Sequence, residues 1–226
     1  MLSMGPPMAE DALRRALSIG ADRAVLLTDR YFAGSDTLAT TYALAAAITK
    51  IGELWGPPSL VFTGEQTIDG DTAQVGPGIA KRLGYTQLTY LQKIVQADPL
   101  AGSIVVERRA EGGTQVLQSR LPVLATMLDA GEPCRRGSLS DALRAARSEV
   151  IKWNAAQAGI SELAKCGLKG SPTVVKKVYA PSARAEKAKP VGQHSPSPAA
   201  LASEILEALF AHAPGLEKDL LAQHNP

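Results

Sequence analysis

Cysteine and aromatic residues are scarce in this chain, which has 226 residues but only two Cys, three Phe and two Trp. Cys134 and Cys166 stand far apart, and neither has another Cys or a His at the spacing of metal ligands, so the sequence predicts no disulfide framework and no zinc site. The chain also lacks the run of about eighteen apolar residues that crosses a membrane and the cationic, apolar start of a secretory signal. We therefore expect no transmembrane segment and a reducing, cytoplasmic compartment.

A strong charge of one sign is absent as well. The 24 Lys and Arg residues nearly balance the 22 Asp and Glu residues, for a formal net charge of +2, so we expect no nucleic-acid partner and no anionic membrane partner. The three histidines, His194, His212 and His224, fall in a predicted linker, a terminal helix and a tail, which are poor places for rigid catalysis. We predict no catalytic residue and no metal site.

Apolar residues make up 45% of the chain, enough for an ordinary core, and they recur as short β-prone runs that alternate with helical patterns. The first half is predicted to contain a strand end and turn at 1–7, a helix at Ala9–Ile19 closed by Gly20, a strand at Ala24–Thr28, a helix from Leu38 to about Gly52, and a strand at Ser59–Thr63. This alternation is typical of an α/β fold with a mostly parallel sheet.

The second half predicts antiparallel additions and a C-terminal arm. Its expected elements are a strand at Gln87–Ile94, a hairpin of Ile104–Arg108 with Thr114–Gln118, a strand at Leu121–Thr126, a helix at Ser140–Asn154, a loop and short strand at Gly167–Tyr179, a linker at Pro181–Pro198, and an amphipathic helix at Ala199–His212. We therefore predict an α/β domain at 1–155, a loop and linker arm at 156–198, and a C-terminal helix at 199–226 that packs on a partner subunit.

The loop Gly64–Pro77, with the sequence GEQTIDGDTAQVGP, joins the strand at Ser59–Thr63 to a helical pattern. Backbone N–H groups at such a junction bind phosphate, and glycines permit the close approach of a ligand, so the loop predicts a nucleotide site. It matches neither the dinucleotide-binding glycine pattern nor the Walker pattern, which leaves a plain glycine-rich connector as the alternative. Asp71 or Thr72 is a candidate helix cap; a cap at Gly76 would instead put Pro77 at the favoured first position.

A second polar loop, Asp29–Thr37, follows the strand at Ala24–Thr28 and contains Phe32. In one interpretation it is an ordinary connection with Phe32 in the core, and Ser35 or Asp36 caps the next helix. In the other it is a second wall of the same pocket, because loops that follow neighbouring parallel strands share one edge of the sheet.

Three segments together resemble the beta subunit of the electron transfer flavoproteins. Gly64–Gly76 resembles the adenine-nucleotide loop of that family, VERRAEGGTQ at 106–115 with Leu121-Pro122 resembles its hairpin, and MGP at 4–6 with GADRA at 20–24 resembles its early strand, helix and strand. The resemblance covers nearly all of residues 1–180. It implies an adenine-nucleotide alpha hydrolase-like, Rossmann-like sheet with antiparallel hairpin additions and a C-terminal arm that ends in a helix.

The resemblance implies a heterodimer in which an alpha subunit carries a redox-active FAD while this chain binds AMP or a second FAD. Phe32–Thr40 and Gly167–Thr173 look like the electron-bifurcating branch, whose beta subunit holds FAD and receives a hydride from NADH, so FAD is favoured over AMP. The chemistry would belong to the flavin, and the protein would supply position and electrostatics. The cofactor-binding residues so implied are Met4, Phe32, Asp36, Thr37, Gly64, Gln66, Thr67, Ile68, Asp69, Gly70, Asp71, Thr72, Ala73, Gln74, Val75 and Gly76.

Family members begin with a further strand-helix-strand portion, which would lie upstream of Met1, so we expect the chain to lack the first part of its domain. The family's dehydrogenase-docking loop resembles Gly137–Ser140, which makes Leu139 the candidate anchor for an acyl-CoA dehydrogenase-type or other flavoprotein dehydrogenase. Two other functions stay open. One is a regulatory α/β module that binds AMP or ATP without electron transfer, and the other is a structural subunit that holds AMP.

Overall fold

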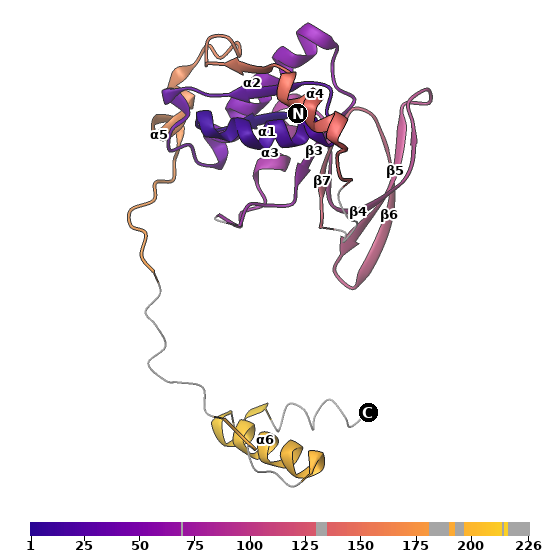
Figure 1. Ribbon diagram of the computed structural model, residues 1–226, viewed down its shortest axis with the longest axis vertical. Coiled ribbons are helices and arrows are strands. Elements are labelled where there is room, and N and C mark those ends of the chain that lie inside the picture. Colours follow the sequence, from indigo (N-terminus) through magenta and orange to yellow (C-terminus); the bar gives the residue numbers. More distant parts are fainter. Residues whose placement is uncertain (69, 130–134, 181–189, 193–196, 214, 217–226) are drawn as a thin grey trace. The chain divides into compact units, whose positions relative to one another are not determined.

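The structure is a computed structural model that describes residues 1–68, 70–129, 135–180, 190–192, 197–213 and 215–216 (Figure 1). The chain divides into two compact units, Met1–Lys176 and Lys177–Pro226, which are described separately. The first unit carries both sheets, and the second carries one long helix. The candidate site therefore has to be sought in the first unit, where the strands end.

The first sheet of this unit is parallel and has three strands in the order β1-β2-β8. Its strands are β1 (Leu2–Met4), β2 (Ala24–Leu27) and β8 (Val150–Trp153). Alternate residues of β2 face opposite sides: Ala24 and Leu26 pack with α1 (Glu10–Ser18) and α4 (Leu139–Arg147), whereas Val25 and Leu27 pack with α2 (Thr37–Trp55). Helices thus cover both faces, which is the arrangement that a parallel sheet requires.

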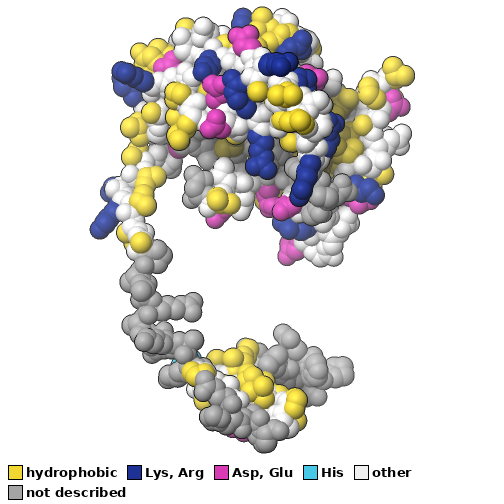
Figure 2. Space-filling view, viewed as in Figure 1, with side chains coloured by type: hydrophobic (Ala, Val, Ile, Leu, Met, Phe, Trp, Pro, Cys, Tyr) yellow, Lys and Arg dark blue, Asp and Glu magenta, His cyan; other side chains and the backbone are white. Residues whose placement is uncertain are grey.

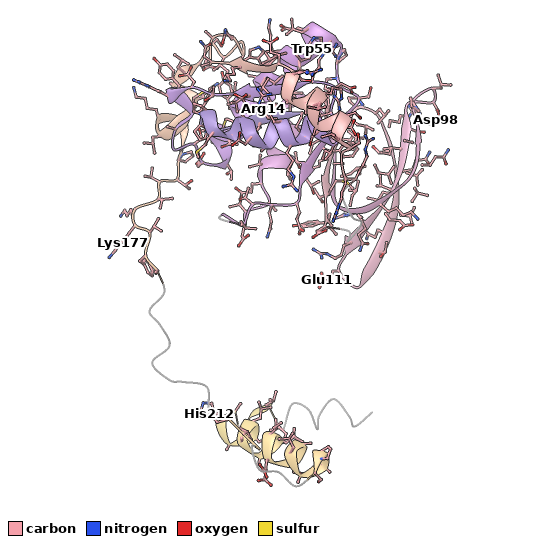
Figure 3. All side chains as sticks on the ribbon, viewed as in Figure 1. Arg14, Trp55, Asp98, Glu111, Lys177 and His212 are labelled. Carbon is pink, nitrogen blue, oxygen red and sulfur yellow. The ribbon has the colours of Figure 1, made fainter. Side chains whose placement is uncertain are left out.

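The second sheet has five strands in the order β3-β7-β4-β5-β6. Its strands are β3 (Leu60–Gly64), β7 (Val123–Met127), β4 (Thr86–Asp98), β5 (Ser103–Ala110) and β6 (Gly113–Arg120). The first three are parallel, and β4, β5 and β6 are antiparallel. On one face Leu124 packs with residues of α2 and of α3 (Val75–Leu83). Asp98 and Glu111, labelled in Figure 3, mark the turns at opposite ends of β5.

These sheets confirm the predicted α/β fold, which is mostly parallel with antiparallel hairpin additions, and the parallel part is divided between two sheets. The predicted single helix at Ser140–Asn154 is wrong, because α4 ends at Arg147 and Ser148 is extended with φ −70° and ψ 143°. Val150–Trp153 then pairs with β2 as strand β8. The short strand expected within Gly167–Tyr179 is also wrong, since that stretch begins with a helical turn, α5 (Gly167–Gly170), and continues without strand pairing.

The remaining helical elements are short in the first unit and long in the second. They are the 3-10 turns η1 (Pro7–Ala9), η2 (Arg30–Phe32) and η3 (Leu163–Lys165), and the helix α6 (Pro198–His212). The first unit extends beyond residue 155 to Lys176, because Ala155, Ala158, Ile160 and Cys166 are buried against α2. Helix α6 confirms the helix expected at Ala199–His212, and none of its residues is buried.

The two tryptophans pack together where α2 meets the first sheet. Trp55 ends α2 and Trp153 ends β8, and their ring centroids are 6.3 Å apart with an angle of 15° between the planes. The guanidinium of Arg23 lies 5.0 Å from the centroid of the Trp55 ring, which is within cation-π range. Trp55 is labelled in Figure 3.

Charges of both signs are mixed on the visible face of the first unit, where dark blue basic and magenta acidic side chains lie among one another (Figure 2). This distribution agrees with the small net charge of +2. Within the described residues, every helix is too short or too polar to cross a membrane.

Candidate functional site

Two helices begin beyond the carboxyl ends of the parallel strands, namely α2 after β2 and α3 after β3. They pack closely, since a Cβ added at Gly78 of α3 would lie 2.6 Å from Cγ2 of Thr41 in α2. Thr37 Oγ1 donates a hydrogen bond of 3.0 Å to Gln74 Oε1. The structure thus brings the loop Asp29–Thr37 and the loop Gly64–Pro77 together. The expected reason, one shared sheet edge, is wrong, because β2 and β3 belong to different sheets and the contact runs through α2 and α3.

Helix α3 starts at Val75 without a side-chain cap, because its N-cap residue, Gln74, makes no capping hydrogen bond. The predicted caps at Asp71, Thr72 or Gly76 are therefore wrong. Pro77 is the third residue of the helix, where the missing N–H leaves no intrahelical bond unmade. The first intrahelical bond of the described helix start runs from Gly78 N to Gln74 O, at 2.9 Å, so the amides of Val75 and Gly76 precede it. Val75 is partly exposed and Gly76 is buried.

The loop in front of α3 faces solvent and contains two strained residues. Gln66, Thr67, Ile68, Gly70, Asp71 and Thr72 are exposed, while Asp69 lies outside the described residues. Asp71 and Ala73 adopt the left-handed region, with φ of 49° and 52°. For Ala73, which has a Cβ and no polar side chain to compensate, this conformation costs roughly 1–2 kcal/mol. Strain of this kind collects at ligand sites and persists only where the surroundings impose it.

Open space lies beside the start of the loop. A Cβ added at Gly64 would have no neighbour within 4 Å, and one added at Gly70 would meet only Thr67 Oγ1, at 3.5 Å. Gln66 Nε2 donates to Asp71 Oδ1 at 3.2 Å, and Asp71 N donates to Thr67 O at 3.0 Å. These bonds shape the loop from within and leave the space beside Gly64 accessible.

The floor under α3 is formed by two threonines that the sequence analysis did not single out. A Cβ added at Gly76 would lie 2.6 Å from Thr126 Cγ2 and 2.8 Å from Thr63 Oγ1, so only glycine fits there. Among the described residues, Thr63 Oγ1 is buried without a hydrogen-bond partner. Thr126 Oγ1 accepts a bond of 3.0 Å from the amide of Tyr90, which has a φ of 60°. The place of Thr63 at the end of a predicted strand was the available signal; Tyr90 gave none.

Asp36 caps α2 as predicted, because its Oδ1 accepts bonds from Leu38 N at 2.9 Å and Ala39 N at 3.0 Å. Burial acts to raise the pKa of this carboxyl, but hydrogen bonds from the Ala39 amide, from the hydroxyl and amide of Thr173 and from the Leu38 amide outweigh it and hold the pKa below its usual value. Phe32 is 7% exposed and lies in the core beside α2, and Met4 packs against the same core. These two residues therefore meet the core rather than the loop surface.

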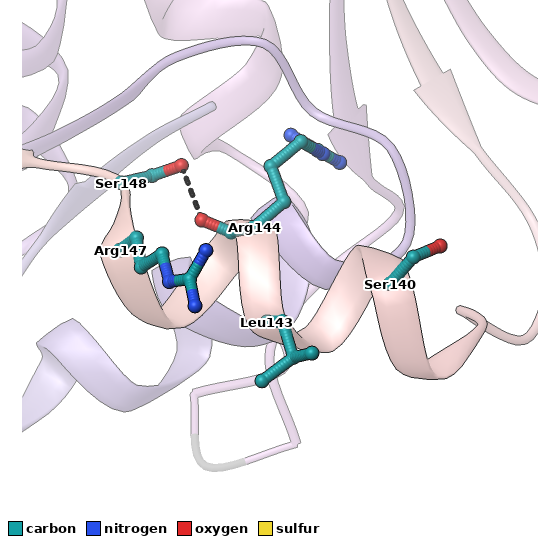
Figure 4. A pocket seen from close by; sticks show the side chains of 5 residues that line it. All are labelled: Ser140, Leu143, Arg144, Arg147 and Ser148. Atoms are coloured by element: carbon teal, nitrogen blue, oxygen red, sulfur yellow. Dashed lines mark hydrogen bonds between the residues drawn. The ribbon is translucent and has the colours of Figure 1, made fainter.

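A separate surface pocket of about 500 Å³ lies on α4 and is lined by Ser140, Leu143, Arg144, Arg147 and Ser148 (Figure 4). None of these residues is among the predicted cofactor contacts. Arg144 donates to Leu17 O at 2.7 Å, which ties α4 to the end of α1. A capping box of Ser138 and Asp141 starts α4, and hydrogen bonds from the amide and hydroxyl of Ser138 lower the pKa of the Asp141 carboxyl. The same start leaves Leu139 79% exposed.

Comparison with known proteins gives close matches over almost the whole chain. The family described as "Electron transfer flavoprotein domain" matches residues 1–158. "Protein FixA" of Azorhizobium caulinodans is 65% identical over 223 residues, which are 98% of this chain and 78% of that protein. "Protein FixA" of Rhizobium leguminosarum bv. phaseoli is 62% identical over 225 residues, covering 100% of this chain and 80% of that protein.

A more distant relative carries a different name. "Electron transfer flavoprotein subunit beta" of Clostridium acetobutylicum is 46% identical over 178 residues, which are 78% of this chain and 65% of that protein. The family match begins at residue 1 of this chain, and the chain covers 78% of the length of the Azorhizobium caulinodans relative.

Proposed function

Since this chain belongs to the electron transfer flavoprotein family and is similar to its beta subunits, we propose that it binds the adenine nucleotide of an FAD at the start of α3 and, paired with an alpha subunit, passes electrons. AMP is the alternative ligand at the same place. Family membership alone gives the electron-transfer context. The ligand and its position rest on the geometry of α3.

The observation that carries the proposal is the uncapped start of α3 below a strained, exposed loop. The amides of Val75 and Gly76 supply the donors that a diphosphate needs, and the positive end of the helix dipole favours its charge. The open space beside Gly64 leaves room for the ligand. The donor set and the space therefore fit a nucleotide.

In this proposal the loop residues hold the nucleotide, and the bond from Thr37 to Gln74 closes the wall on the side of α2. The loop contacts are Gly64, Gln66, Thr67, Ile68, Gly70, Asp71, Thr72 and Ala73, together with Asp69, and the helix start contributes Val75 and Gly76. When bound, a flavin supplies the redox chemistry. The protein orients the nucleotide and excludes water from one side of it.

Two surfaces suit protein partners. Helix α6 leaves Ile205, Leu206 and Leu209 between 44% and 47% exposed, and an alpha subunit is the proposed cover for this apolar stripe. Leu139, which is 79% exposed at the start of α4, is the proposed anchor for a flavoprotein dehydrogenase. If the bound nucleotide is FAD, we propose that NADH is the hydride donor and that the heterodimer carries out electron bifurcation.

Counting flavins by absorbance tests the ligand. The chain is copurified with its alpha subunit, and the flavin content per heterodimer is measured after denaturation. Two flavins support the FAD form, whereas one flavin with bound AMP supports a subunit that holds AMP as a structural element. No flavin together with tight ATP binding would contradict the proposal and support a regulatory module.

The dehydrogenase contact is tested separately with Leu139→Ala. We expect electron transfer from the partner dehydrogenase to fall while the flavin count stays the same, because the Leu139 side chain is exposed and is not among the proposed nucleotide contacts. Leu100→Ala is the matched control, since Leu100 is also an exposed leucine but lies in the β4–β5 turn. Equal effects of the two substitutions would remove Leu139 from the proposed contact.

A further inference from the structure

Residues Gly167–Thr173, here called the clasp, cross the loop that precedes α2. Leu168 N donates to Ala33 O at 3.2 Å, and Gly167 N donates to Ser35 Oγ at 3.2 Å. Ser171 Oγ accepts a bond of 2.8 Å from Asp36 N and donates to Gly167 O at 2.7 Å. The clasp therefore holds successive residues of the loop although it lies more than a hundred residues away in sequence.

Glycines at 34 and 167 allow the clasp and the loop to approach closely. Gly167 has a φ of +57°, and a Cβ on it would overlap the carbonyl oxygen of Tyr31. A Cβ on Gly34, at a φ of +72°, would lie 2.6 Å from Leu168 Cγ. Ser171 is 9% exposed, so its hydroxyl bonds are sheltered from water. The loop backbone therefore lies against Gly167, and the Leu168 side chain lies against Gly34.

Asp36 is the residue through which the clasp reaches the candidate site. Its Oδ1 accepts the two capping amides of α2, and its Oδ2 accepts bonds from Thr173 N at 3.2 Å and Thr173 Oγ1 at 2.8 Å. A carboxylate has about four acceptor positions, so this one is fully used within the protein. Asp36 is therefore not available as a direct cofactor ligand. Its neighbour Thr37 donates the bond to Gln74 that joins α2 to the start of α3.

We infer that Asp36 and Thr173 are positioning residues, which fix Thr37 against Gln74 and so hold the start of α3 in its nucleotide-binding geometry. The inference rests on the proposed function, since it concerns the same nucleotide site. Thr173 acts on Asp36, Asp36 orients Thr37, and Thr37 bonds Gln74. The bond from Thr173 to Asp36 lies outside the nucleotide contacts, which makes the effect separable from direct binding.

The test uses the full chain, with AMP and FAD as the two probes in isothermal titration calorimetry. Asp36→Asn keeps an oxygen for the α2 amides but replaces the acceptor that Thr173 uses, and Thr173→Val removes the hydroxyl donor. Because one hydrogen bond changes an equilibrium by about fivefold, we expect each variant to bind the nucleotide about fivefold more weakly. The double variant should bind no more weakly than the worse single variant, because both remove one shared interaction.

Two controls separate positioning from general damage. Thr173→Ser keeps the hydroxyl and should restore binding to within twofold of the parent. Thr114→Val removes another exposed threonine hydroxyl, on β6, and should leave binding unchanged. The inference is overturned if Thr173→Ser binds the nucleotide as weakly as Thr173→Val does. It is also overturned if Thr114→Val weakens binding as much as Thr173→Val does.

Two further outcomes separate a failure of the positioning role from a failure of the proposed nucleotide binding. If the parent binds nucleotide, Thr37→Val weakens binding, and neither Asp36→Asn nor Thr173→Val does, the positioning role is overturned while the proposed function stands. If the parent binds neither AMP nor FAD, the proposed function is overturned and the inference with it.

Discussion

The starts of α2 and α3 are joined by the bond from Thr37 to Gln74, yet they are completed in opposite ways. The start of α2 has the Asp36 cap, and that cap is held in turn by Thr173. The start of α3 has no side-chain cap and is preceded by left-handed residues at Asp71 and Ala73. One helix start has a side-chain cap, and the other has none.

This difference indicates where a ligand contributes stability. A helix start that is already capped gains little from an anion, whereas free amides gain both hydrogen bonds and a favourable dipole interaction. We therefore expect removal of the N-cap side chain to lower the stability of the fold more at α2 than at α3.

The largest effect on stability is expected at the floor of α3. Gly76→Ala places a methyl group against Thr126 and Thr63, and we expect the free energy of unfolding to fall by about 1–3 kcal/mol, as for other overpacked sites. Gly64→Ala is the control, since nothing lies within 4 Å of its Cβ position. It should unfold like the parent but bind AMP more weakly. Urea unfolding followed by circular dichroism gives the first quantity and calorimetry the second.

If Gly64→Ala binds AMP as tightly as the parent does, the space beside Gly64 does not hold the ligand. If Gly76→Ala is as stable as the parent, the floor of α3 is looser than described.

The next effect is expected at the cap of α2. Asp36→Ala removes the acceptor of the Leu38 and Ala39 amides, and we expect a loss of about 1 kcal/mol in the free energy of unfolding. Gln74→Ala, at the N-cap of α3, removes no capping bond and should cost less. Equal losses at the two positions in urea unfolding would abolish the contrast between the helix starts.

A smaller effect, of opposite sign, is expected at Ala73. Glycine adopts left-handed backbone without steric cost, so Ala73→Gly should raise the free energy of unfolding by up to about 1 kcal/mol. Ala142→Gly, on the exposed side of α4, should lower it by about 1 kcal/mol because the helix there has ordinary geometry. Thermal unfolding of both variants measures these changes. If Ala73→Gly lowers the free energy of unfolding, the left-handed conformation of Ala73 is not strained.

The smallest effect concerns acid. The pKa of Asp36 is lower in the folded chain than its value of about 3.9 in an unfolded one, so its stabilisation is complete above that value and is lost as the pH falls through the folded pKa. Stability of the parent should therefore fall below about pH 4. Asp36→Asn should lose less stability over the same range, and curves of equal slope for the two proteins would contradict this.

The sequence analysis left open whether the two loops meet. They do meet, but through the contact of α2 with α3, because β2 and β3 lie in different sheets. The sequence did not predict the start of α3, since Ala73 is intrinsically unsuited to left-handed backbone and nothing in the sequence signals it. The same limit applies to Tyr90 in β4. Such conformations are imposed by neighbouring segments, so the sequence around them carries no local signal.

Long-range pairing explains the other differences. Val150 and Trp153 are spaced as on a helix face, and only their pairing with β2, more than a hundred residues earlier, makes them a strand. The clasp is also polar and rich in glycine, like a plain loop. Its role depends on contacts with Ser35 and Asp36 at the far end of the chain.

The stacked tryptophan pair has a practical consequence for spectroscopy. Trp55 and Trp153 are the two tryptophans of the chain, so its intrinsic fluorescence originates from one place, where α2 meets the first sheet. A change in emission wavelength will therefore report the separation of α2 from that sheet. The emission wavelength will change little when a rearrangement is confined to β4, β5 and β6 of the second sheet. Emission and circular dichroism together can therefore test whether the two sheets unfold at the same temperature.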